Sequence, residues 1–536
     1  MNYSQLEING FKPTHEQVDI LDCVAGSVTF GRMKIGAFAG AGKSTSLKLT
    51  AKAFPKKKFL YIVFNKSMQI EAQEGFKGLN NITVRTSHSL AFQGTNASSR
   101  FGDRLKSRLS YHDIKGALGI GSEYVGGFPP SRAVAAVIGV INNFCYSSER
   151  SFKPSMLPSE FVKEAQLSKL LDRSGSKDAK ALAKYACIQA TKIWNDFILD
   201  DEKSFPITHD AYLKIWQLEG AKGLGNYDII MLDEAQDANP AILKAISDQE
   251  SQSIYVGDKH QSIYGWRGST NAMESVEGKE MFLTQSFRFG ENIAGAANMI
   301  LDLKRQFLGE QFPRIKGFEN ASPGQGGHAI LCRTNAQVIN NLLDRSDYGL
   351  IGDFSEVTGL LYDLNHLRDG NLKEIKDKEI KLYSSLDELK IITEEMSDPS
   401  GKTLIKLHDR FQNNLGGLSK MLKDRSEPGR YKNVITTAHK SKGLEWSNVS
   451  LSDDFQSLYK PEEDGVKLFL ESASDIEELN LIYVGATRAQ STLFSSDILV
   501  KTRDIVRGSL RVTNRSDFER KLFEGAQEDL SNPLTL

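Results

Sequence analysis

A glycine-rich turn in front of a helix is the first set of residues in this sequence that could do chemistry. Residues 35–46 read IGAFAGAGKSTS, an apolar strand followed by small residues and then by a helix. Small residues let backbone N–H groups approach phosphate oxygens, and the start of a helix attracts negative charge. We expect Lys43 to reach the β- and γ-phosphates of a nucleotide and Ser44 to bind Mg²⁺. The positions expected to hold the phosphates are Ala39, Gly40, Ala41, Gly42, Lys43, Ser44 and Thr45.

This phosphate-loop pattern has one departure, because the general motif places glycine where the chain has Ala37. A chance glycine-rich turn before a helix is therefore the alternative interpretation.

Two adjacent acids follow another apolar strand, in the segment YDIIMLDEAQD over residues 227–237. We expect Asp233 to hold Mg²⁺ through water and Glu234 to polarise the attacking water as a general base. Two acids after a strand can also be an ordinary exposed strand end. The phosphate loop upstream favours the catalytic interpretation, since a lysine and acids on neighbouring parallel strands can converge on one metal ion.

A third segment, IYVGDKHQSIYGWRG over residues 254–268, combines a strand end with a polar and aromatic stretch. Gln261 could detect the γ-phosphate and transmit its state. Trp266 and Arg267 offer a flat stacking surface and a cation, which suit unpaired bases and phosphate. A core aromatic is the alternative for Trp266.

Alternating strands and helices must position these groups. We predict strands at Met33–Ala39, Phe59–Phe64, Ile82–Thr86, Ile229–Leu232, Ile254–Val256 and Met281–Thr284, with helices at Lys43–Phe54 and Lys66–Phe76. Strands separated by helical segments predict an α/β fold with a parallel sheet covered on both faces.

Two further regions interrupt and follow this pattern. The sequence from Thr95 to Thr191 has a mostly helical pattern, and we interpret it as an insertion. Within it, Phe144-Cys145-Tyr146 is either buried core or a DNA-facing element, and we prefer core. A second α/β region starts at Ala329–Arg333, resumes at Val434–Thr437 and Val449–Leu451, and continues through Leu481–Val484. Between its parts, KEIKDKEIK (residues 373–381) predicts a solvated helix.

Composition excludes several classes. The 536 residues are 40% hydrophobic and 25% charged, an ordinary globular mix, and no apolar run is long enough for a membrane span. The net charge of −1 means that any nucleic-acid contact must use a local surface. The N-terminal residues lack the pattern of a secretory signal, and four scattered cysteines without CxxC spacing indicate reduced thiols. We therefore expect an intracellular protein.

Taken together, the three motifs resemble those of superfamily 1 helicases of the UvrD/Rep type, which implies a location that is cytoplasmic and associated with the nucleoid, or nuclear. Further motifs of that family follow in order. FKPTHEQ (residues 11–17) resembles the adenine-reading motif and places Gln17 on the base. Phe64-Asn65-Lys66 and Thr86-Ser87-His88-Ser89 resemble two motifs that bind single-stranded DNA. QSFR (residues 285–288) resembles the family's QNYR, which implies that Phe287 stacks on adenine and Arg288 contacts the γ-phosphate.

The second half of the chain carries the remaining motifs. TAHKSKGLEW (residues 437–446) resembles a THSAKGLEF-type motif, which implies that His439 and Lys442 lie near DNA and Glu445 near nucleotide. YVGATR (residues 483–488) resembles YVAITR and places a second arginine finger at Arg488. By residue type alone, Phe64 could instead be core, and His88 and His439 could be capping or core histidines.

The wording of several strings is nearer still to the F-box DNA helicase branch, although no F-box segment is apparent before Phe11. The resemblance implies two RecA-like motor domains with mostly helical insertions. The expected boundaries are residues 1–94 and 191–290 for the first motor domain (1A), 95–190 for a helical accessory insertion (1B), 291–343 and 432–536 for the second motor domain (2A), and 344–431 for a reduced accessory insertion (2B-like).

The resemblance implies an ATP-dependent DNA helicase and single-strand translocase with 3′→5′ polarity, using ATP and Mg²⁺ on single-stranded DNA and single-strand/duplex junctions. A DNA-dependent ATPase that removes recombinase or other proteins from DNA with little unwinding is the alternative, and repair or recombination proteins are expected partners. A small-molecule kinase or nucleotide switch would explain Lys43 and Asp233 but not Gln261, Arg488 or the second α/β half.

Overall fold

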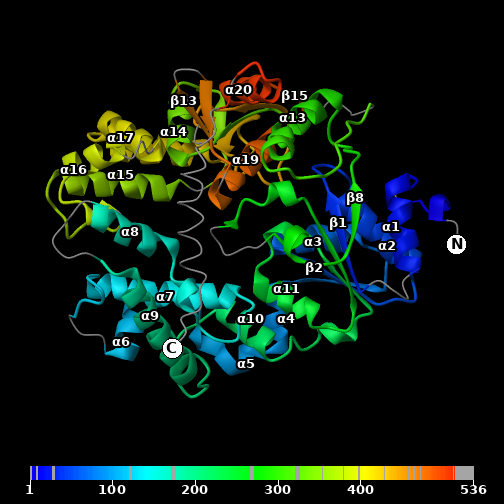
Figure 1. The fold of residues 1–536 in the computed structure, drawn as a ribbon, viewed down its shortest axis with the longest axis horizontal. Coiled ribbons are helices and arrows are strands. Elements are labelled where there is room, and N and C mark those ends of the chain that lie inside the picture. The colour runs from blue at the N-terminus through cyan, green and yellow to red at the C-terminus, as the bar shows by residue number, and fades with distance from the viewer. Residues whose placement is uncertain are drawn as a thin grey trace. The chain divides into compact units, whose positions relative to one another are not determined.

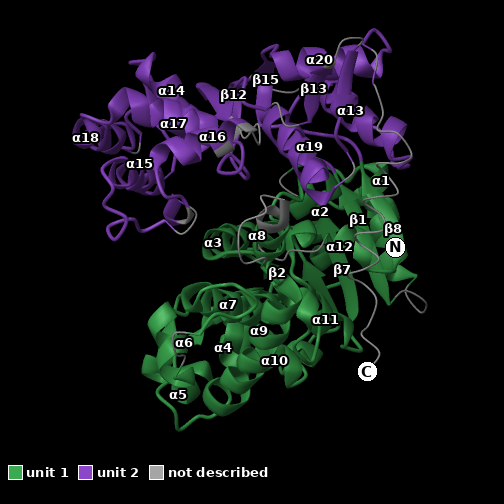
Figure 2. Ribbon diagram, turned by 60° about the vertical axis from the view of Figure 1, so that its left-hand side comes forward, with its two compact units in different colours: residues 1–37, 42–283, 516–536 green, residues 38–41, 284–515 purple. Residues whose placement is uncertain are grey.

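The computed structural model describes residues 3–7, 10–26, 31–119, 123–170, 177–265, 271–319, 326–352, 354–377, 380–395, 399–427, 429–455, 458–462, 465–470, 472–510 and 512. The chain forms two compact units, coloured separately in Figure 2. The first unit takes its described residues from 1–37 and 42–283, and the second from 38–41 and 284–515. Four residues of the phosphate loop, 38–41, are thus grouped with the second unit.

A six-stranded parallel sheet forms the centre of the first unit, in the strand order β3-β2-β6-β7-β1-β8 (Figure 1). Its strands are β1 (Arg32–Ala37), β2 (Phe59–Val63), β3 (Ile82–Thr86), β6 (Ile229–Leu232), β7 (Gln252–Gly257) and β8 (Lys279–Leu283). Every residue of β2 and β6 is buried, as expected for strands covered on both faces. The predicted strands and the α/β fold class are confirmed.

Helices follow the strands of this sheet, and side chains cap most of their N-termini. They are α1 (His15–Ala25), α2 (Lys43–Ala53), α3 (Lys66–Gly75), α4 (Ser87–Gly94), α11 (Pro240–Ser247) and α12 (Ala272–Ser275). Short helical turns elsewhere in the chain are η1 (Tyr3–Gln5), η2 (Gly102–Arg104), η3 (Pro154–Met156), η4 (Trp194–Ile198), η5 (Leu224–Asn226), η6 (Ala235–Asp237), η7 (Lys259–Gln261) and η9 (Ile380–Leu382).

The segment between β3 and β6 is mostly helical; the helical character predicted for Thr95–Thr191 is present and continues beyond it to Leu218. It contains α5 (Ala97–Phe101), α6 (Tyr111–Leu118), α7 (Pro130–Tyr146), α8 (Ser159–Leu170), α9 (Ala179–Ile193) and α10 (His209–Leu218), with a short parallel pair of β4 (Leu105–Lys106) and β5 (Ile207–Thr208). Figure 1 shows α6, α7, α9 and α10 gathered together. Phe144 and Cys145 are buried in the shared core, which confirms the preferred interpretation of these two residues.

The second unit is built on a five-stranded parallel sheet in the order β10-β11-β9-β12-β15. The strands are β9 (His328–Cys332), β10 (Tyr348–Leu350), β11 (Asn433–Thr437), β12 (Trp446–Leu451) and β15 (Ala489–Leu493). An antiparallel hairpin pairs β13 (Tyr459–Glu462) with β14 (Gly465–Leu468). The helices packed with this part of the chain are α13 (Glu291–Phe307), α14 (Asn335–Leu343), α19 (Ala473–Ala486) and α20 (Asp497–Val506).

Four helices follow β10, namely α15 (Ser355–Arg368), α16 (Leu386–Glu395), α17 (Pro399–Phe411) and α18 (Leu415–Arg425). The solvated helix predicted at residues 373–381 is wrong, because its first five residues form a turn and extended chain, and the helical turn η9 begins only at Ile380. The carboxylate of Asp363 accepts the backbone N–H groups of Lys376 and Asp377, at 3.1 and 2.7 Å, and Ile375 is buried. These tertiary contacts outweigh the helical tendency of the segment.

No helix in the described part of the chain is both long and apolar enough to cross a membrane.

Candidate nucleotide and nucleic-acid site

The candidate residues of the first unit lie just beyond the carboxyl ends of its parallel strands. In such sheets the carboxyl ends share one edge, where ligands bind. β1 precedes the phosphate loop, β6 precedes Asp233, and β7 precedes Gln261. A hollow of about 940 Å³ opens at the opposite edge, where it is lined by Arg32, Ser253 and Lys279. None of the candidate residues lines that hollow.

The N-terminus of α2 has the features of an anion-binding site. Gly42, the N-cap of α2, has a left-handed φ of 76° and no side-chain cap, whereas Thr14, Asn65 and Thr86 cap α1, α3 and α4 with their side chains. Helix N-termini leave backbone N–H groups without intrahelical partners, and these groups attract phosphate. Lys43 is the first residue of this helix, so its charge adds to the same end.

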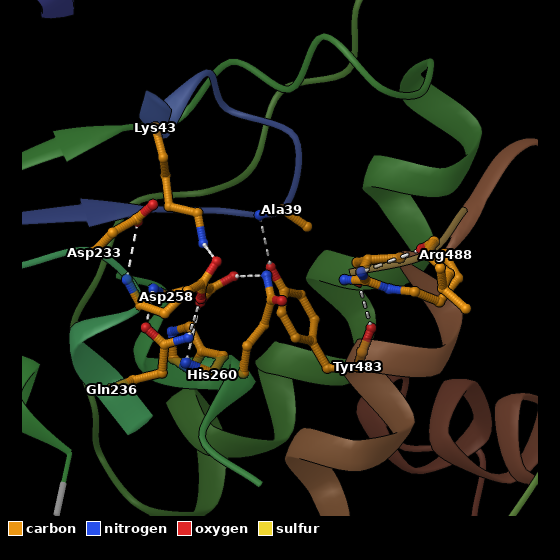
Figure 3. Close-up of polar contacts among 12 residues, drawn as sticks. Ala39, Lys43, Asp233, Gln236, Asp258, His260, Tyr483 and Arg488 are labelled. Atoms are coloured by element: carbon orange, nitrogen blue, oxygen red, sulfur yellow. Dashed lines mark hydrogen bonds and ion pairs between the residues drawn. The ribbon is translucent and has the colours of Figure 1, made fainter. Parts of the chain in front are cut away.

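Lys43 meets the catalytic acid predicted for it. Its Nζ lies 2.7 Å from Oε1 of Glu234, and both side chains are mostly shielded (Figure 3). Burial alone would lower the pKa of Lys43, but Glu234 and then Asp233 more than offset it, so the pKa is raised. The lysine is therefore fully charged in the physiological range. Glu234 has a left-handed φ of 48°, a strained conformation of the kind that clusters at functional sites.

Asp233 is held on both oxygens. Tyr61 of β2 donates its hydroxyl to Oδ2, and the backbone N–H of Glu234 donates to Oδ1 at 2.9 Å. Burial and the adjacent Glu234 carboxylate raise the pKa of Asp233, and burial together with Asp233 raises that of Tyr61 well above its usual value. Sequence reasoning missed Tyr61. The signal was a phenol inside the fully buried strand FLYIV, where a hydroxyl needs a partner.

These residues fit a Mg²⁺ ion held together with phosphate. Among the described residues there is no group of three or more His, Cys, Asp or Glu that could hold a metal ion. Mg²⁺ is usually held by one or two carboxylates plus substrate phosphates, so a full protein cage is not required. Buried Asp233, which lies next to a second carboxylate in the chain, and exposed Ser44 provide suitable oxygen donors.

Gln261 is fixed at the end of β7 by Asp258. Its Nε2 donates to Oδ2 of Asp258 at 2.8 Å, while Oδ1 accepts the backbone N–H of His260 at 3.0 Å. All three residues are buried. The amide is thus set in one orientation at the same edge of the sheet as Lys43 and Glu234.

Gln17 both caps α1 and contacts α2. Its Oε1 accepts the backbone N–H of Thr14 and its Nε2 donates to Oγ of Ser46, each at 3.0 Å. A glutamine amide has two N–H donors and two acceptor lone pairs. These two bonds leave one N–H donor and one acceptor lone pair of the amide. An adenine edge presents one donor and one acceptor, so this pair of groups could recognise it.

In the second unit, three distant motifs converge on Arg288. Its Nε lies 2.7 Å from Oε2 of Glu445, and its Nη1 donates to the backbone carbonyl of Thr487 at 3.1 Å. The neighbouring Arg488 is only 2% exposed, and its Nε donates to the carbonyl of Val484 at 2.9 Å. Arg488 therefore has partners within its own unit, and its role as an arginine finger stays a prediction.

The first part of the phosphate loop packs on the same motif of the second unit. The backbone N–H of Phe287 donates to the carbonyl of Gly40 at 2.9 Å. Gly40 has a φ of +72°, and a Cβ there would lie 2.6 Å from Cβ of Arg288, so only glycine fits. Ala39 donates its N–H to the hydroxyl of Tyr483 at a long 3.4 Å (Figure 3). Phe287 itself is 43% exposed, which leaves a face for stacking.

Phe64 lies on the surface and not in the core. Its side chain is 43% exposed, which argues against the core interpretation, and its ring is stacked on Tyr264, with centroids 6.4 Å apart and planes 7° apart. Sequence reasoning missed Tyr264. The neighbouring Asn65 caps α3 through its carbonyl oxygen, which accepts the N–H of Met68 at 2.9 Å.

His88 lies at a hollow of about 480 Å³ in the first unit, lined by Arg85, His88, Ser89, Phe92, Gln93 and Tyr212. Its Nε2 lies 3.2 Å from Oδ1 of Asp210, and Tyr146 donates its hydroxyl to Oδ2 at the same distance. Burial would raise the pKa of Asp210, but these bonds lower it. Thr86 caps α4 through its hydroxyl, which accepts the N–H of Ser89. His88 is therefore neither an N-cap nor a core residue.

His439 and Lys442 follow β11 in the second unit. Burial, Arg333 and Lys442 lower the pKa of His439 to about 4, so the ring is neutral at physiological pH. Arg333, the first residue after β9, is one of the charges that lower the pKa of this histidine, and it was missed from the sequence. Trp266 and Arg267, predicted to contact DNA, lie outside the described residues.

Comparison with known proteins identifies the family. The UvrD/REP helicase N-terminal domain matches residues 25–277, and the UvrD-like helicase C-terminal domain matches residues 336–499. The chain belongs to the UvrD-like helicase family. The first match covers all strands of the six-stranded sheet except β8, and the second covers all strands of the five-stranded sheet except β9.

Among curated relatives of the UvrD-like chain, F-box DNA helicase protein 1 of Schizosaccharomyces pombe is 29% identical over 93% of this chain and 59% of its own length. F-box DNA helicase 1 of Gallus gallus is 28% identical over 91% of this chain and 49% of its own length. The ATP-dependent DNA helicase PcrA of Staphylococcus epidermidis is 37% identical, over 14% of this chain and 12% of its own. The chain thus spans about half to three fifths of the F-box relatives.

Proposed function

We propose that this chain is an ATP-dependent DNA helicase and single-stranded DNA translocase. The observation that carries the proposal is the ion pair of Lys43 with Glu234 at the uncapped start of α2, beside buried Asp233. This is the charge arrangement that nucleotide hydrolysis requires. Family membership and the names of the relatives, which are DNA helicases, support DNA as the polymer on which the chain acts.

In this proposal the residues have separate tasks. The N–H groups at the start of α2 and the ammonium of Lys43 bind the triphosphate, and Glu234 orients the attacking water and accepts its proton. Ser44 and Asp233 would hold Mg²⁺, which supplies neutralisation of phosphate charge when bound. Gln261 senses the γ-phosphate. Arg288 and Arg488, carried by the second unit, stabilise charge on the transferred group, and Phe287 and Gln17 select adenine.

Contacts with single-stranded DNA are assigned to surface groups. Phe64 offers a stacking face, and sequence-tolerant stacking of this kind contributes about 1–3 kcal/mol per base. His88 follows the end of β3 in the first unit, and His439 and Lys442 follow the end of β11 in the second, where Arg333 follows β9. Differential affinity for nucleotide states can then be converted into stepping along the strand. The 3′→5′ polarity, junction substrates and repair or recombination partners are part of this proposal.

The first test is ATP turnover with and without single-stranded DNA. We expect DNA to stimulate the wild type, and Lys43→Ala to abolish the stimulated turnover without loss of folding, because the phosphate contact and its charge disappear. Lys48→Ala, on the same helix, is the matched control and should retain turnover. A Lys43→Ala protein with normal turnover would remove the phosphate role, and turnover indifferent to DNA would favour a kinase or nucleotide switch.

A second assay separates unwinding from protein removal. Duplexes with a 3′ or a 5′ single-stranded tail are compared with a recombinase-coated strand of the same length. Strand separation restricted to the 3′-tailed duplex is the expected result. Displacement of the coating protein without strand separation would instead support a DNA-dependent ATPase that strips proteins, and separation of the 5′-tailed duplex would reverse the polarity.

A further inference from the structure

Gln236 has no role in the reaction proposed above. Its side-chain amide is buried next to Glu234, the proposed general base. It is 0% exposed and lies in η6, two residues after Glu234. Its Nε2 donates to Oε2 of Glu234 at 2.5 Å, and its Oε1 accepts the backbone N–H of Asp258 at 3.1 Å. One side chain therefore joins the acid that follows β6 to the first residue after β7.

The two oxygens of Glu234 have different partners. Lys43 contacts Oε1 at 2.7 Å, and Gln236 donates to Oε2. When a triphosphate is bound, the ammonium of Lys43 is required at the phosphates. The donor on Oε2 can stay in place, because Gln236 reaches no phosphate-binding group. A carboxylate has about four lone-pair sites, so this bond fixes its orientation and still leaves sites for the attacking water.

The side-chain oxygen of Gln236 packs closely against the end of β7. A Cβ at Gly257 would lie 2.2 Å from Oε1 of Gln236, so glycine at the end of β7 makes room for this amide. Asp258, whose N–H is bound by Gln236, holds Nε2 of Gln261 through its carboxylate at 2.8 Å. The general base and the residue assigned to sense the γ-phosphate are therefore linked through two side chains and one backbone group, all within the first unit.

We propose that Gln236 is a positioning residue for ATP hydrolysis, which orients Glu234 toward the attacking water and couples that orientation to Gln261. The proposal rests on the function proposed above for this site. In this proposal Gln236 acts through the carboxylate of Glu234, to which it donates its Nε2 hydrogen bond. The proton released by water goes to Glu234, and the amide remains neutral throughout.

The test compares two substitutions of nearly the same size. Gln236→Met removes both hydrogen bonds but keeps the volume, and we expect kcat for DNA-stimulated ATP hydrolysis to fall about 10-fold or more, since a positioned base contributes roughly 10²–10⁴-fold. The KM for ATP should change little, because the phosphate contacts of Lys43 remain. Gln249→Met is the control, since Gln249 is a half-buried glutamine of the same unit whose Nε2 donates to the nearby carbonyl of Ala245.

Gln236→Glu supplies a readout that a purely structural role would not move. It keeps an acceptor for the N–H of Asp258 but replaces the amide donor on Oε2 of Glu234 with an oxygen. We expect kcat for DNA-stimulated ATP hydrolysis to fall as in Gln236→Met, while the KM for ATP changes little, because only the donor to the general base is lost. A variant that is merely destabilised would instead lose folded protein, with kcat per folded molecule unchanged.

The outcomes distinguish this proposal from the function on which it rests. If Glu234→Gln hydrolyses ATP normally, the proposed function fails and Gln236 has no base to position. If Glu234→Gln is inactive but Gln236→Met and Gln236→Glu both have the wild-type kcat, only the role of Gln236 is overturned. Should Gln236→Met not fold, the kcat and KM of Gln236→Glu decide alone.

Discussion

Burial keeps His439 neutral in the folded protein. From this we predict how the stability of the second unit depends on pH. Its pKa is lowered to about 4, whereas an unfolded histidine titrates near 6.5. Above pH 6.5 both states are neutral, and below it the unfolded chain binds a proton that the folded chain does not. Stability should therefore fall as the pH drops from 6.5 toward 4, by roughly 2 kcal/mol between pH 7 and pH 5.

The measurement is the urea unfolding midpoint of wild type and His439→Gln at pH 7 and pH 5. The glutamine variant should show a smaller drop, because it has no proton to gain on unfolding. His328 and His408 also have lowered pKa values, through burial first, so some acid sensitivity remains in the variant. Equal drops in the two proteins would show that His439 titrates normally in the folded chain.

For single residues, the sequence indicates which side chains belong to the candidate site, but not all of the side chains that hydrogen-bond to them. Lys43 and Glu234 were expected at one phosphate; their side chains lie 2.7 Å apart, and their role at a phosphate stays a prediction. Nothing in the order of residues identifies Tyr61 as the donor to Asp233, or Gln236 as the link between two strand ends, because these contacts depend on strand order in the sheet. Strand order is a long-range property that local patterns do not contain.

Two helices of the first unit, α4 and α10, approach so closely that a glycine is required between them. A Cβ on Gly94 would lie 2.4 Å from Nε1 of Trp216, the same nitrogen that donates to the carbonyl of Lys222 at 3.0 Å. Gly94→Ala should therefore destabilise the protein by about 1–3 kcal/mol, the usual cost of overpacking a core. The measurement is the midpoint of thermal or urea unfolding.

Gly116 in α6 is the matched control for that substitution. A Cβ at Gly116 meets nothing within 4 Å, and the residue lies inside a helix. Gly116→Ala should be neutral or stabilise by about 0.5–1 kcal/mol, because alanine has the higher helix propensity. If both variants had the same midpoint, the close approach at Trp216 would not be limiting.

Element prediction succeeded where local pattern and tertiary structure agree. The strand predicted at Ile229–Leu232 has the observed bounds, since an apolar run in a fully buried strand has no competing structure. It failed at residues 373–381, where the charged repeat suggested a helix but Asp363 binds the backbone N–H groups of Lys376 and Asp377. A side chain ten or more residues away decided the conformation, and periodicity carries no signal for it.

For the whole molecule, the proposed reaction requires arginines from the second unit to act on a nucleotide bound by the first. Arg288 is held by Glu445 and by the carbonyl of Thr487 through two different nitrogens of its guanidinium. A lysine ammonium is a single charged point and cannot reproduce this planar geometry. We therefore predict that nucleotide binding and hydrolysis can be separated by a substitution at Arg288.

Arg288→Lys should lower kcat for ATP hydrolysis by about 10³-fold or more, the scale of effect of an arginine finger. Nucleotide affinity, measured with a non-hydrolysable ATP analogue, should change far less because Lys43 and the start of α2 are intact. Arg314→Lys is the control, since Arg314 of the same unit forms a paired contact with Asp302, with both N–O distances 3.0 Å. Normal turnover in Arg288→Lys would show that Arg288 is not needed for hydrolysis. A loss of nucleotide affinity as large as the loss of kcat would show that Arg288 acts in binding only.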